Sequence, residues 1–273
     1  MLSIIRKKFR SAPAFLRTRF YANRFKNSVS AHAEKTIKNA DEFLQAFFKP
    51  NTTGSTTRIY EFYDGYVLKA RVGDSNAIGE TCILQEYSKL PGFAIKSRQS
   101  VFDLGAHIGS FAVQAAKKGA MVYAFEPEDT NFSLLCENIA LNGLMNKVIP
   151  IKKGIYNFTG RVKLSASQDT AGHSLMHDTG GHVQEIEVTT LAQGLREVNV
   201  ARVDLLKIDI EGAEYDVFES LDCKTCERIN KIVGEYHLIS GTRKKDFSLI
   251  QQLLAPYFGE VKRLPPYYFY AWR

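Results

Sequence analysis

The sequence of 273 residues has no apolar run close to the roughly 18 residues that a membrane-spanning helix needs, and it has few cysteines. No apolar stretch of signal-peptide length follows the basic N-terminus, which disfavours a secreted chain. The four cysteines are too few and too scattered for a disulfide framework, so we expect a reducing compartment such as the cytoplasm. With 45% hydrophobic residues, the chain is long enough for one ordinary domain plus an extension.

Acidic residues are absent from positions 1–33, which carry eight lysines and arginines. Because the net charge of the whole chain is only +7, the remaining residues carry −1, and the body of the protein is nearly neutral. Large apolar residues are interleaved with the basic ones, as in helices that lie on an anionic membrane. A peripheral membrane contact is therefore one prediction for residues 1–33. A cleaved transit peptide, an arm that binds a polyanion and a solvated helix packed on the domain are the alternatives.

Turn and strand patterns divide the chain into a basic N-terminal helical extension, residues 1–57, and a larger domain, residues 58–273. A helical pattern covers 34–48, and the polar segment KPNTTGSTT is the predicted connector. Residues 58–72 hold two alternating aromatic and β-branched runs around Asp64-Gly65, which predicts a β-hairpin. Residues 79–90 are predicted to form a short helix.

From about residue 100 the predicted strands and helices alternate, which indicates an α/β fold with a mostly parallel, doubly wound sheet. The predicted strands are 101–104, 121–125, 148–155, 205–210 and 231–237, and the predicted helices are 110–118, 130–142, 214–221 and 246–254. An antiparallel insertion is expected at 160–167 and 184–191, around a flexible loop. The tail from 259 predicts a terminal antiparallel hairpin.

The segment VFDLGAHIGSFA joins the first core strand to its helix, where doubly wound sheets bind ligands. Gly105 and Gly109 let the backbone approach a ligand, and the helix start near Ser110 offers free N–H groups to a carboxylate or phosphate. The G-x-G-x-x-G pattern of dinucleotide sites is absent. Glu126 ends the next strand, 21 residues after Gly105, where a carboxylate can accept both ribose hydroxyls. This spacing is typical of S-adenosylmethionine sites.

Four ordered blocks of the chain resemble the FkbM-type methyltransferases. They are DGYVLKARVGDSNAIGETCILQEY, VFDLGAHIGSFA, VYAFEPEDTNFSLLCENIALNG and LLKIDIEGAEYDVFESL, and GEYH matches a later strand of the family. The chain departs from the family at His107, where Asn is usual. The resemblance implies a Rossmann-like class I methyltransferase fold and the cofactor S-adenosylmethionine. It also implies methyl transfer to a hydroxyl of a sugar, a glycan or a small natural product. The implied cofactor site comprises Asp103, Gly105, Ala106, His107, Gly109, Ser110, Glu126, Pro127 and Asp209.

Charged residues also follow two later strands of the predicted sheet. Lys207, Asp209 and Glu211 come at the end of one strand, and Glu235 and His237 come at the end of the next. Since parallel strands present their carboxyl ends at one edge, we expect these five side chains to converge and to carry the catalysis. His237 is the leading general base, because its ordinary pKa of roughly 6.5 suits proton abstraction near neutral pH. Asp209 or Glu211 would orient His237 or replace it.

The same side chains permit other roles. One is a divalent metal site that would activate the acceptor hydroxyl. Its possible ligands are Asp209, Glu211, Glu235 and His237. An acid after a strand often caps the next helix, which is the alternative for Glu211 and Glu214. For Lys207, the alternative to a substrate contact is a buried ion pair with Asp209.

Two other groups of residues have the spacing of metal or redox sites. Cys223 and Cys226 are three residues apart, but no second pair follows, so we expect an inert pair at a helix end. His173, His177 and His182 are expected in a substrate-facing loop, with a metal site as the alternative.

The Pro-Pro-Tyr sequence at 265–267 resembles a signature of amino-methylating enzymes. That signature ends the strand that here reads LLKIDIEG, so its position disfavours base N-methylation and a nucleic-acid acceptor. Three hypotheses follow from the sequence: an O-methyltransferase for a small molecule or glycan, a nucleic-acid methyltransferase that uses the basic arm, and a non-catalytic membrane-associated module.

Overall fold

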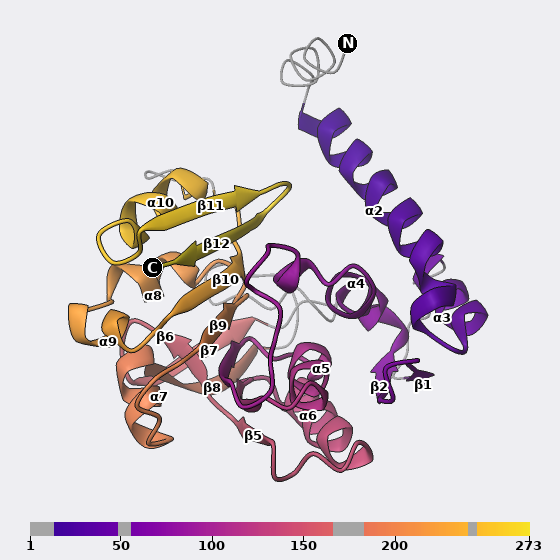
Figure 1. Ribbon diagram of the computed structural model, residues 1–273, viewed down its shortest axis with the longest axis horizontal. Helices are drawn as coiled ribbons and strands as arrows, with labels where there is room; N and C mark the ends of the chain where they lie inside the picture. Colours follow the sequence, from indigo (N-terminus) through magenta and orange to yellow (C-terminus); the bar gives the residue numbers. More distant parts are fainter. Residues whose placement is uncertain (1–13, 49–55, 166–182, 240–244) are drawn as a thin grey trace.

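A seven-stranded sheet forms the centre of the chain, with the strand order β11-β12-β10-β9-β3-β4-β5 (Figure 1). The computed structural model describes residues 14–48, 56–165, 183–239 and 245–273. The parallel strands are β3 (Ser100–Leu104), β4 (Met121–Phe125), β5 (Val148–Ile151), β9 (Leu205–Ile208) and β10 (Lys231–Glu235). The terminal hairpin of β11 (Glu260–Leu264) and β12 (Tyr268–Trp272) extends one edge, with β12 antiparallel to both neighbours. The predicted α/β Rossmann-like sheet with a terminal antiparallel hairpin is confirmed.

Helices cover both faces of this sheet, so its central strands β3 and β9 are buried and mostly apolar, apart from the paired Asp103 and Lys207. Val101 and Leu205 belong to one core cluster with residues of α5 (Ser110–Lys117) and α6 (Asp129–Leu141). Phe102 and Leu206, their chain neighbours, belong to a second cluster on the other face. That second cluster includes α7 (Leu191–Glu197), α8 (Glu214–Glu219) and α10 (Phe247–Leu254). Alternate residues of each strand therefore supply the two cores.

The N-terminal segment shares the first of these cores. Its elements are α2 (Ala14–Thr36), α3 (Ala40–Phe48) and the predicted hairpin of β1 (Thr57–Glu61) and β2 (Val67–Arg71). Val29, Phe43 and Tyr60 are fully buried in the cluster that contains α5 and α6. The predicted division at residue 57 therefore does not separate two hydrophobic cores. The start of α2 points away from the rest of the chain (Figure 1). No helix in the described part of the chain is long and apolar enough to cross a membrane.

The predicted continuous helix over 34–48 is wrong, because the chain breaks between α2 and α3. Ile37 forms a β-bridge with Phe62, and the Asn39 side chain donates to the Ile59 carbonyl and accepts from the Glu61 N–H. These bonds draw residues 37–39 onto the hairpin. Helical periodicity does not predict that the Asn39 side chain binds the backbone of the hairpin.

The predicted helix over 79–90 is also wrong. Within 79–90 only a π-helical turn (Gly79–Ile83) and a 3-10 turn (Glu86–Ser88) form, and they follow a 3-10 turn (Val72–Asp74) and α4 (Ser75–Ile78) in one irregular segment. Gln85 has a left-handed backbone with a φ of 49°, which interrupts the helix. The irregular path places several of its side chains beside the site described below.

A small second sheet has the order β6-β8-β7. Its strands are β6 (Gly154–Tyr156), β7 (Gly160–Ser165) and β8 (Val183–Thr190), and β7 pairs antiparallel with β8 as expected. The predicted strand 148–155 splits, because β5 stays in the central sheet while β6 pairs with β8. The loop with His173, His177 and His182 lies outside the described residues. The short helices α7 and α9 (Cys223–Glu227) were not predicted.

Candidate active site

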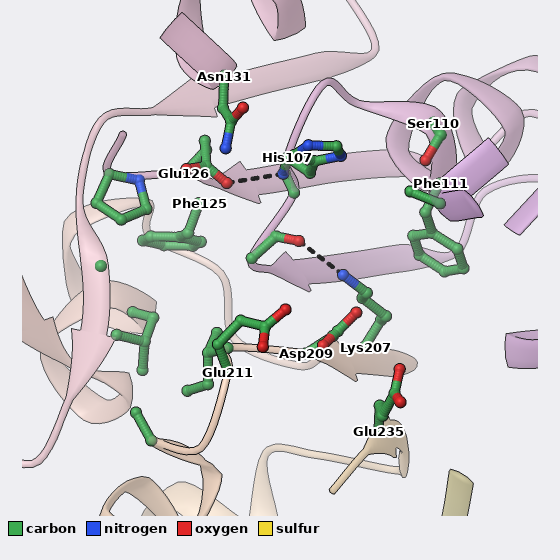
Figure 2. Close-up of a pocket in the computed structure, with 18 of the residues that line it drawn as sticks. His107, Ser110, Phe111, Phe125, Glu126, Asn131, Lys207, Asp209, Glu211 and Glu235 are labelled. Carbon is green, nitrogen blue, oxygen red and sulfur yellow. Dashed lines mark hydrogen bonds between the residues drawn. The ribbon is translucent and has the colours of Figure 1, made fainter. Parts of the chain in front are cut away.

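A cavity of about 340 Å³ opens at the carboxyl ends of β3, β4, β9 and β10 (Figure 2). The start of α5, the irregular segment before β3 and the small sheet complete its walls. Most predicted site residues line it: Gly105, Ala106, His107, Ser110, Glu126, Pro127, Lys207, Asp209, Glu211, Glu235 and His237. Asp103 and Gly109 are not among the lining residues. The cavity therefore lies where the sheet topology predicts a ligand.

The turn between β3 and α5 has a backbone that only glycine permits at two positions. Gly105 has a φ of +78°, and a Cβ there would lie 1.9 Å from the Asp209 carbonyl oxygen. Gly109 has a φ of +86°, and a Cβ there would lie 2.6 Å from the Leu135 Cδ1. Both glycines thus let the turn pack tightly, Gly105 against the backbone after β9 and Gly109 against α6.

Glu126 sits at the end of β4, only 5% exposed, with its carboxylate toward this turn (Figure 2). One oxygen accepts the His107 N–H at 2.7 Å, and the other accepts the Glu128 N–H at 3.0 Å. Burial raises the pKa of Glu126, and these N–H groups oppose the rise. An ionised carboxylate has about four acceptor sites, so two stay available beside the cavity. These sites fit the two hydroxyls of a ribose.

The His107 ring is held by two residues that the sequence did not single out, Arg71 and Asp74. The fully buried Asp74 carboxylate accepts the Arg71 backbone N–H at 2.7 Å and lies 3.3 Å from the His107 Nε2. Arg71 also donates to the Asn131 side chain. Although burial alone would raise it, the His107 and Arg71 hydrogen bonds hold the pKa of Asp74 well below its usual range. In the sequence, Arg71 and Asp74 stand out only because both lie in the first block that resembles the family.

Lys207 pairs with Asp103 rather than with Asp209. The Lys207 Nζ lies 3.1 Å from the Asp103 carboxylate and donates to the Gly105 carbonyl oxygen at 2.7 Å (Figure 2). Asp103 is fully buried beneath the turn, and Lys207 is almost so. The alternative of a buried ion pair for Lys207 was therefore right in kind but wrong in its partner, which is Asp103 and not Asp209. Because it contacts both Asp103 and the Gly105 carbonyl oxygen, Lys207 stabilises the turn at the cofactor end of the cavity.

The acidic residues meet at the other end of the cavity, around His237. The His237 Nε2 lies 3.3 Å from the Glu211 carboxylate and 3.9 Å from that of Asp209. Asp209 also accepts the Tyr87 hydroxyl at 2.8 Å. Glu235 lines the same end (Figure 2). Of the five side chains expected to converge, Asp209, Glu211, Glu235 and His237 therefore meet here, whereas Lys207 contacts the turn at the cofactor end.

Electrostatics at this end contradict the argument that made His237 the general base. Burial alone would lower the pKa of His237, but Glu214, Glu211 and Asp209 outweigh it and hold that pKa well above its ordinary value. An imidazole that keeps its proton at neutral pH cannot accept another. Burial raises the pKa of Glu211 to about 8, and it also raises that of Glu235 well above normal. With a pKa of about 8, Glu211 is still ionised in part at neutral pH and can accept a proton, so Glu211 is a candidate base beside His237.

Glu80 is a further acid that the sequence reasoning missed. It lines the cavity from the π-helical turn, and burial together with Asp209 and Glu86 raises its pKa to about 8. Tyr87, which holds Asp209, comes from the same irregular segment. The sequence pattern there predicted a regular helix, and nothing in that pattern points these side chains toward β9.

Three of the four proposed metal ligands also lie close together. Asp209, Glu211 and His237 each offer a ligand atom within 4.8 Å of the others, so they would fit a divalent cation. Cys223 and Cys226 give no such site: Cys223 is exposed, and burial raises the pKa of Cys226 to about 12. The protonated thiol agrees with the expected inert pair.

The sheet order and this cavity define a methyltransferase of the Rossmann-like class. More narrowly, a model of the methyltransferase FkbM domain matches residues 103–264, more than half of the chain, and the chain belongs to this family. The family implies S-adenosylmethionine as the methyl donor, and the carboxylate, glycine turn and helix start described above fit that cofactor.

Relatives with known names share the central part of the chain. Methyltransferase sdnD of Sordaria araneosa is 27% identical over 190 residues, which cover 58% of this chain and 73% of that protein. The 31-O-demethyl-FK506 methyltransferase FkbM of Streptomyces tacrolimicus is 25% identical over 192 residues, 59% of this chain and 74% of that protein. A crystal structure of methyltransferase FkbM from Methylobacillus flagellatus KT matches with a TM-score of 0.47 at 18% identity, over 74% of this chain. This chain spans 54% of that structure's chain.

Proposed function

We propose that the protein is an S-adenosylmethionine-dependent O-methyltransferase that acts on a hydroxyl of a sugar, a glycan or a small natural product. The observation that carries the proposal is the cluster of carboxylates around His237, in the same cavity as the ribose-type carboxylate Glu126. A hydroxyl must lose its proton when it is methylated, and this cluster supplies proton acceptors. The name of the Streptomyces tacrolimicus relative, which refers to an oxygen acceptor, favours the same chemistry.

In this proposal, the cofactor end of the cavity binds S-adenosylmethionine and fixes its orientation. In this proposal Glu126 accepts the ribose hydroxyls, and the N–H groups at the start of α5, near Ser110, receive a carboxylate. When bound, S-adenosylmethionine supplies an electrophilic methyl group on a sulfonium. Lys207 and Asp103 keep the Gly105 turn in place, so the methyl group would meet the acceptor in a fixed orientation.

The acceptor end removes a proton. Glu211 would receive this proton from the acceptor hydroxyl while the bound S-adenosylmethionine would supply the methyl group and leave as S-adenosylhomocysteine. The Glu211 side chain is 34% exposed, so the proton can pass from it to water. Tyr87 holds Asp209 in place beside this base.

An assay with isotopically labelled S-adenosylmethionine tests the proposal. The full chain is incubated with metabolite extracts and with a panel of sugars and hydroxylated natural products, and the products are identified by mass spectrometry and NMR. We expect a methyl ether. A labelled amine, a labelled RNA or no labelled product from a chain that binds S-adenosylhomocysteine would contradict it.

A further inference from the structure

Arg71, the last residue of β2, lies outside the residues that match the family model and at the start of α6. Two asparagines of α6 hold β2 along that helix. The Asn138 amide accepts the Lys69 N–H at 2.7 Å and donates to the Lys69 carbonyl oxygen at 3.0 Å. Asn142 bonds both backbone groups of Val67 in the same way. This pairing brings Arg71, further along the strand, to the first turn of α6.

The Arg71 guanidinium joins two segments of the cofactor end. On one side it donates to the Asn131 Oδ1 at 2.5 Å and to the Thr130 Oγ1 at 3.2 Å, both in the first turn of α6. On the other side it lies 3.3 Å from the His107 Nε2, in the turn between β3 and α5. The planar fork of an arginine can make such contacts in several directions at once, whereas a lysine is a point charge.

The fully buried Asp74 carboxylate fixes the positions of both Arg71 and His107. It accepts the Arg71 Nε and Nη2 groups, each at 3.0 Å, and lies 3.3 Å from the His107 Nε2. If that ring nitrogen carries a proton it can donate to Asp74, and if it carries none it can accept from Arg71, so the ring is held in either state. His107 has a φ of 53°, a left-handed backbone that few residues other than glycine adopt. The contacts of its ring therefore stabilise the turn.

Each of the two segments supplies an N–H to the Glu126 carboxylate. One is the His107 N–H at 2.7 Å, and the other is the Glu128 N–H at 3.0 Å. Glu128 caps α6, because its carboxylate accepts the Asn131 N–H at 2.7 Å and the Thr130 hydroxyl at 2.6 Å. Figure 2 shows His107 and Asn131 at the same end of the cavity as Glu126. A shift of either segment would therefore turn the Glu126 carboxylate.

We propose that Arg71 is a positioning residue for the cofactor, which ties the turn after β3 to the start of α6 so that their N–H groups hold the Glu126 carboxylate toward the ribose hydroxyls. This inference rests on the proposed function, because it takes the ribose of S-adenosylmethionine as the ligand of Glu126. Arg71 is not among the residues that line the described cavity, and it acts through His107 and the first turn of α6.

The test compares Arg71→Lys with Lys69→Gln. Arg71→Lys keeps a positive charge beside Asp74 but loses the fork that joins the two segments. The dissociation constant of S-adenosylhomocysteine, measured by calorimetry, should rise roughly tenfold, because binding must then also order the Glu126 carboxylate. Lys69→Gln removes another ion pair between β2 and α6, in which the Lys69 Nζ lies 2.7 Å from the partly exposed Glu137 carboxylate. That control should leave the dissociation constant unchanged.

An analogue of S-adenosylhomocysteine without the two ribose hydroxyls distinguishes positioning from a general structural role. The wild type should bind this analogue roughly 10²-fold more weakly than S-adenosylhomocysteine, whereas Arg71→Lys should bind it only roughly tenfold more weakly. The unfolding temperature of Arg71→Lys should stay within about 4 °C of the wild type. Its kcat at saturating S-adenosylmethionine should stay within about threefold of the wild type, while its KM for S-adenosylmethionine rises.

An unchanged affinity in Arg71→Lys would overturn the proposal, and so would an equal loss of affinity for both ligands. If Arg71→Lys does not fold, Thr130→Val takes its place. Thr130 is exposed and is not among the residues that line the described cavity, and its hydroxyl accepts one of the Arg71 bonds. Thr130→Val should weaken binding of S-adenosylhomocysteine about threefold, and full affinity would reject the role of Arg71.

These binding measurements need no acceptor, so they are independent of the methylation assay. Unchanged affinity in the variants, beside a methyl ether made by the wild type, would reject the role of Arg71 alone. Ribose-dependent binding that Arg71→Lys weakens, without any methyl ether, would reject the proposed O-methylation alone. A wild type that does not bind S-adenosylhomocysteine would reject both.

Discussion

The two ends of the cavity are built from different parts of the chain. At the cofactor end, a single turn supplies two glycines and the His107 N–H, and Glu126 follows one strand later. At the acceptor end, side chains arrive from β9, β10, α8 and the irregular segment before β3. Figure 2 shows the separation, with Glu126 beside His107 and with Asp209, Glu211 and Glu235 on the opposite side of the drawn site.

This difference predicts different consequences of mutation. The cofactor end depends on backbone geometry, so a change there should alter binding. The acceptor end depends on the charges of side chains that share protons, so a change there should alter the rate. The predictions below test that separation, in order of decreasing expected effect.

The largest effect is expected for Glu211→Gln. Without the proton acceptor, kcat should fall by roughly two to four orders of magnitude, while the affinity for S-adenosylhomocysteine is preserved. Steady-state kinetics and calorimetry measure the two quantities, and the exposed Glu227→Gln serves as the control. A Glu211→Gln variant with nearly normal kcat would remove Glu211 from the mechanism and return the role of base to Asp209 or His237.

At the cofactor end, Glu126→Ala is expected to weaken cofactor binding and to leave kcat largely intact. Loss of two charge-assisted hydrogen bonds to ribose hydroxyls should weaken binding of S-adenosylhomocysteine by roughly 10²-fold. Saturating cofactor should then restore most of kcat, because Glu126 does not take part in proton transfer. Calorimetry checks the affinity, and an unchanged dissociation constant would contradict the ribose assignment.

The cofactor end was more predictable from sequence because its signals are local. Gly105, Gly109 and Glu126 stand at short, characteristic spacings, and topology alone predicted that strand ends meet there. Lys207 shows the limit of this reasoning: Asp209 is nearer in sequence, but adjacent parallel strands bring Asp103 opposite Lys207.

The acceptor end was predicted only in part. The convergence of Asp209, Glu211 and His237 followed from topology, but their protonation did not. The pKa of His237 depends on the fully buried Glu214, and no sequence pattern reveals burial of that kind. Glu80 was missed because a left-handed residue and a π-helical turn replaced the regular helix that the pattern predicted.

A smaller change in kcat/KM is expected when the pH is varied. Because a base must be ionised and burial raises the pKa of Glu211 to about 8, kcat/KM for S-adenosylmethionine should rise with pH. A group with that pKa is about one-tenth ionised at pH 7, so the gain from pH 7 to 9 should be roughly tenfold. Because Glu211 and His237 titrate together, the apparent pKa belongs to the pair. A flat profile from pH 6 to 9 would contradict Glu211, a half-buried carboxylate, as the base.

Chelation should have little effect. The proton-acceptor mechanism needs no metal, so activity should persist in EDTA, although Asp209, Glu211 and His237 would fit a divalent cation. Activity is measured before and after chelation, and again after addition of magnesium or manganese. Loss on chelation with recovery on addition of metal would replace the Glu211 base by metal activation of the hydroxyl.

The smallest effect on turnover is expected at the N-terminus, where the structure also restricts the experiment. Removal of all of residues 1–33 would damage the fold, because Val29 and Ala33 are fully buried in the core. A deletion of residues 1–20 keeps Val29 and Ala33 and still removes six of the eight basic residues.

That deletion separates catalysis from a peripheral membrane contact, which we propose for the basic segment. Near an anionic surface each lysine or arginine contributes about 1 kcal/mol, so six of them would dominate binding to vesicles. Turnover on a water-soluble acceptor should stay within about twofold, because the deletion keeps every residue that lines the described cavity. Co-sedimentation with phosphatidylserine vesicles should fall sharply, and the wild type should lose binding as salt screens the charges. An equal sedimented fraction for the full chain and the deletion would reject the membrane contact, whereas lost turnover would show that residues 1–20 contribute to the site.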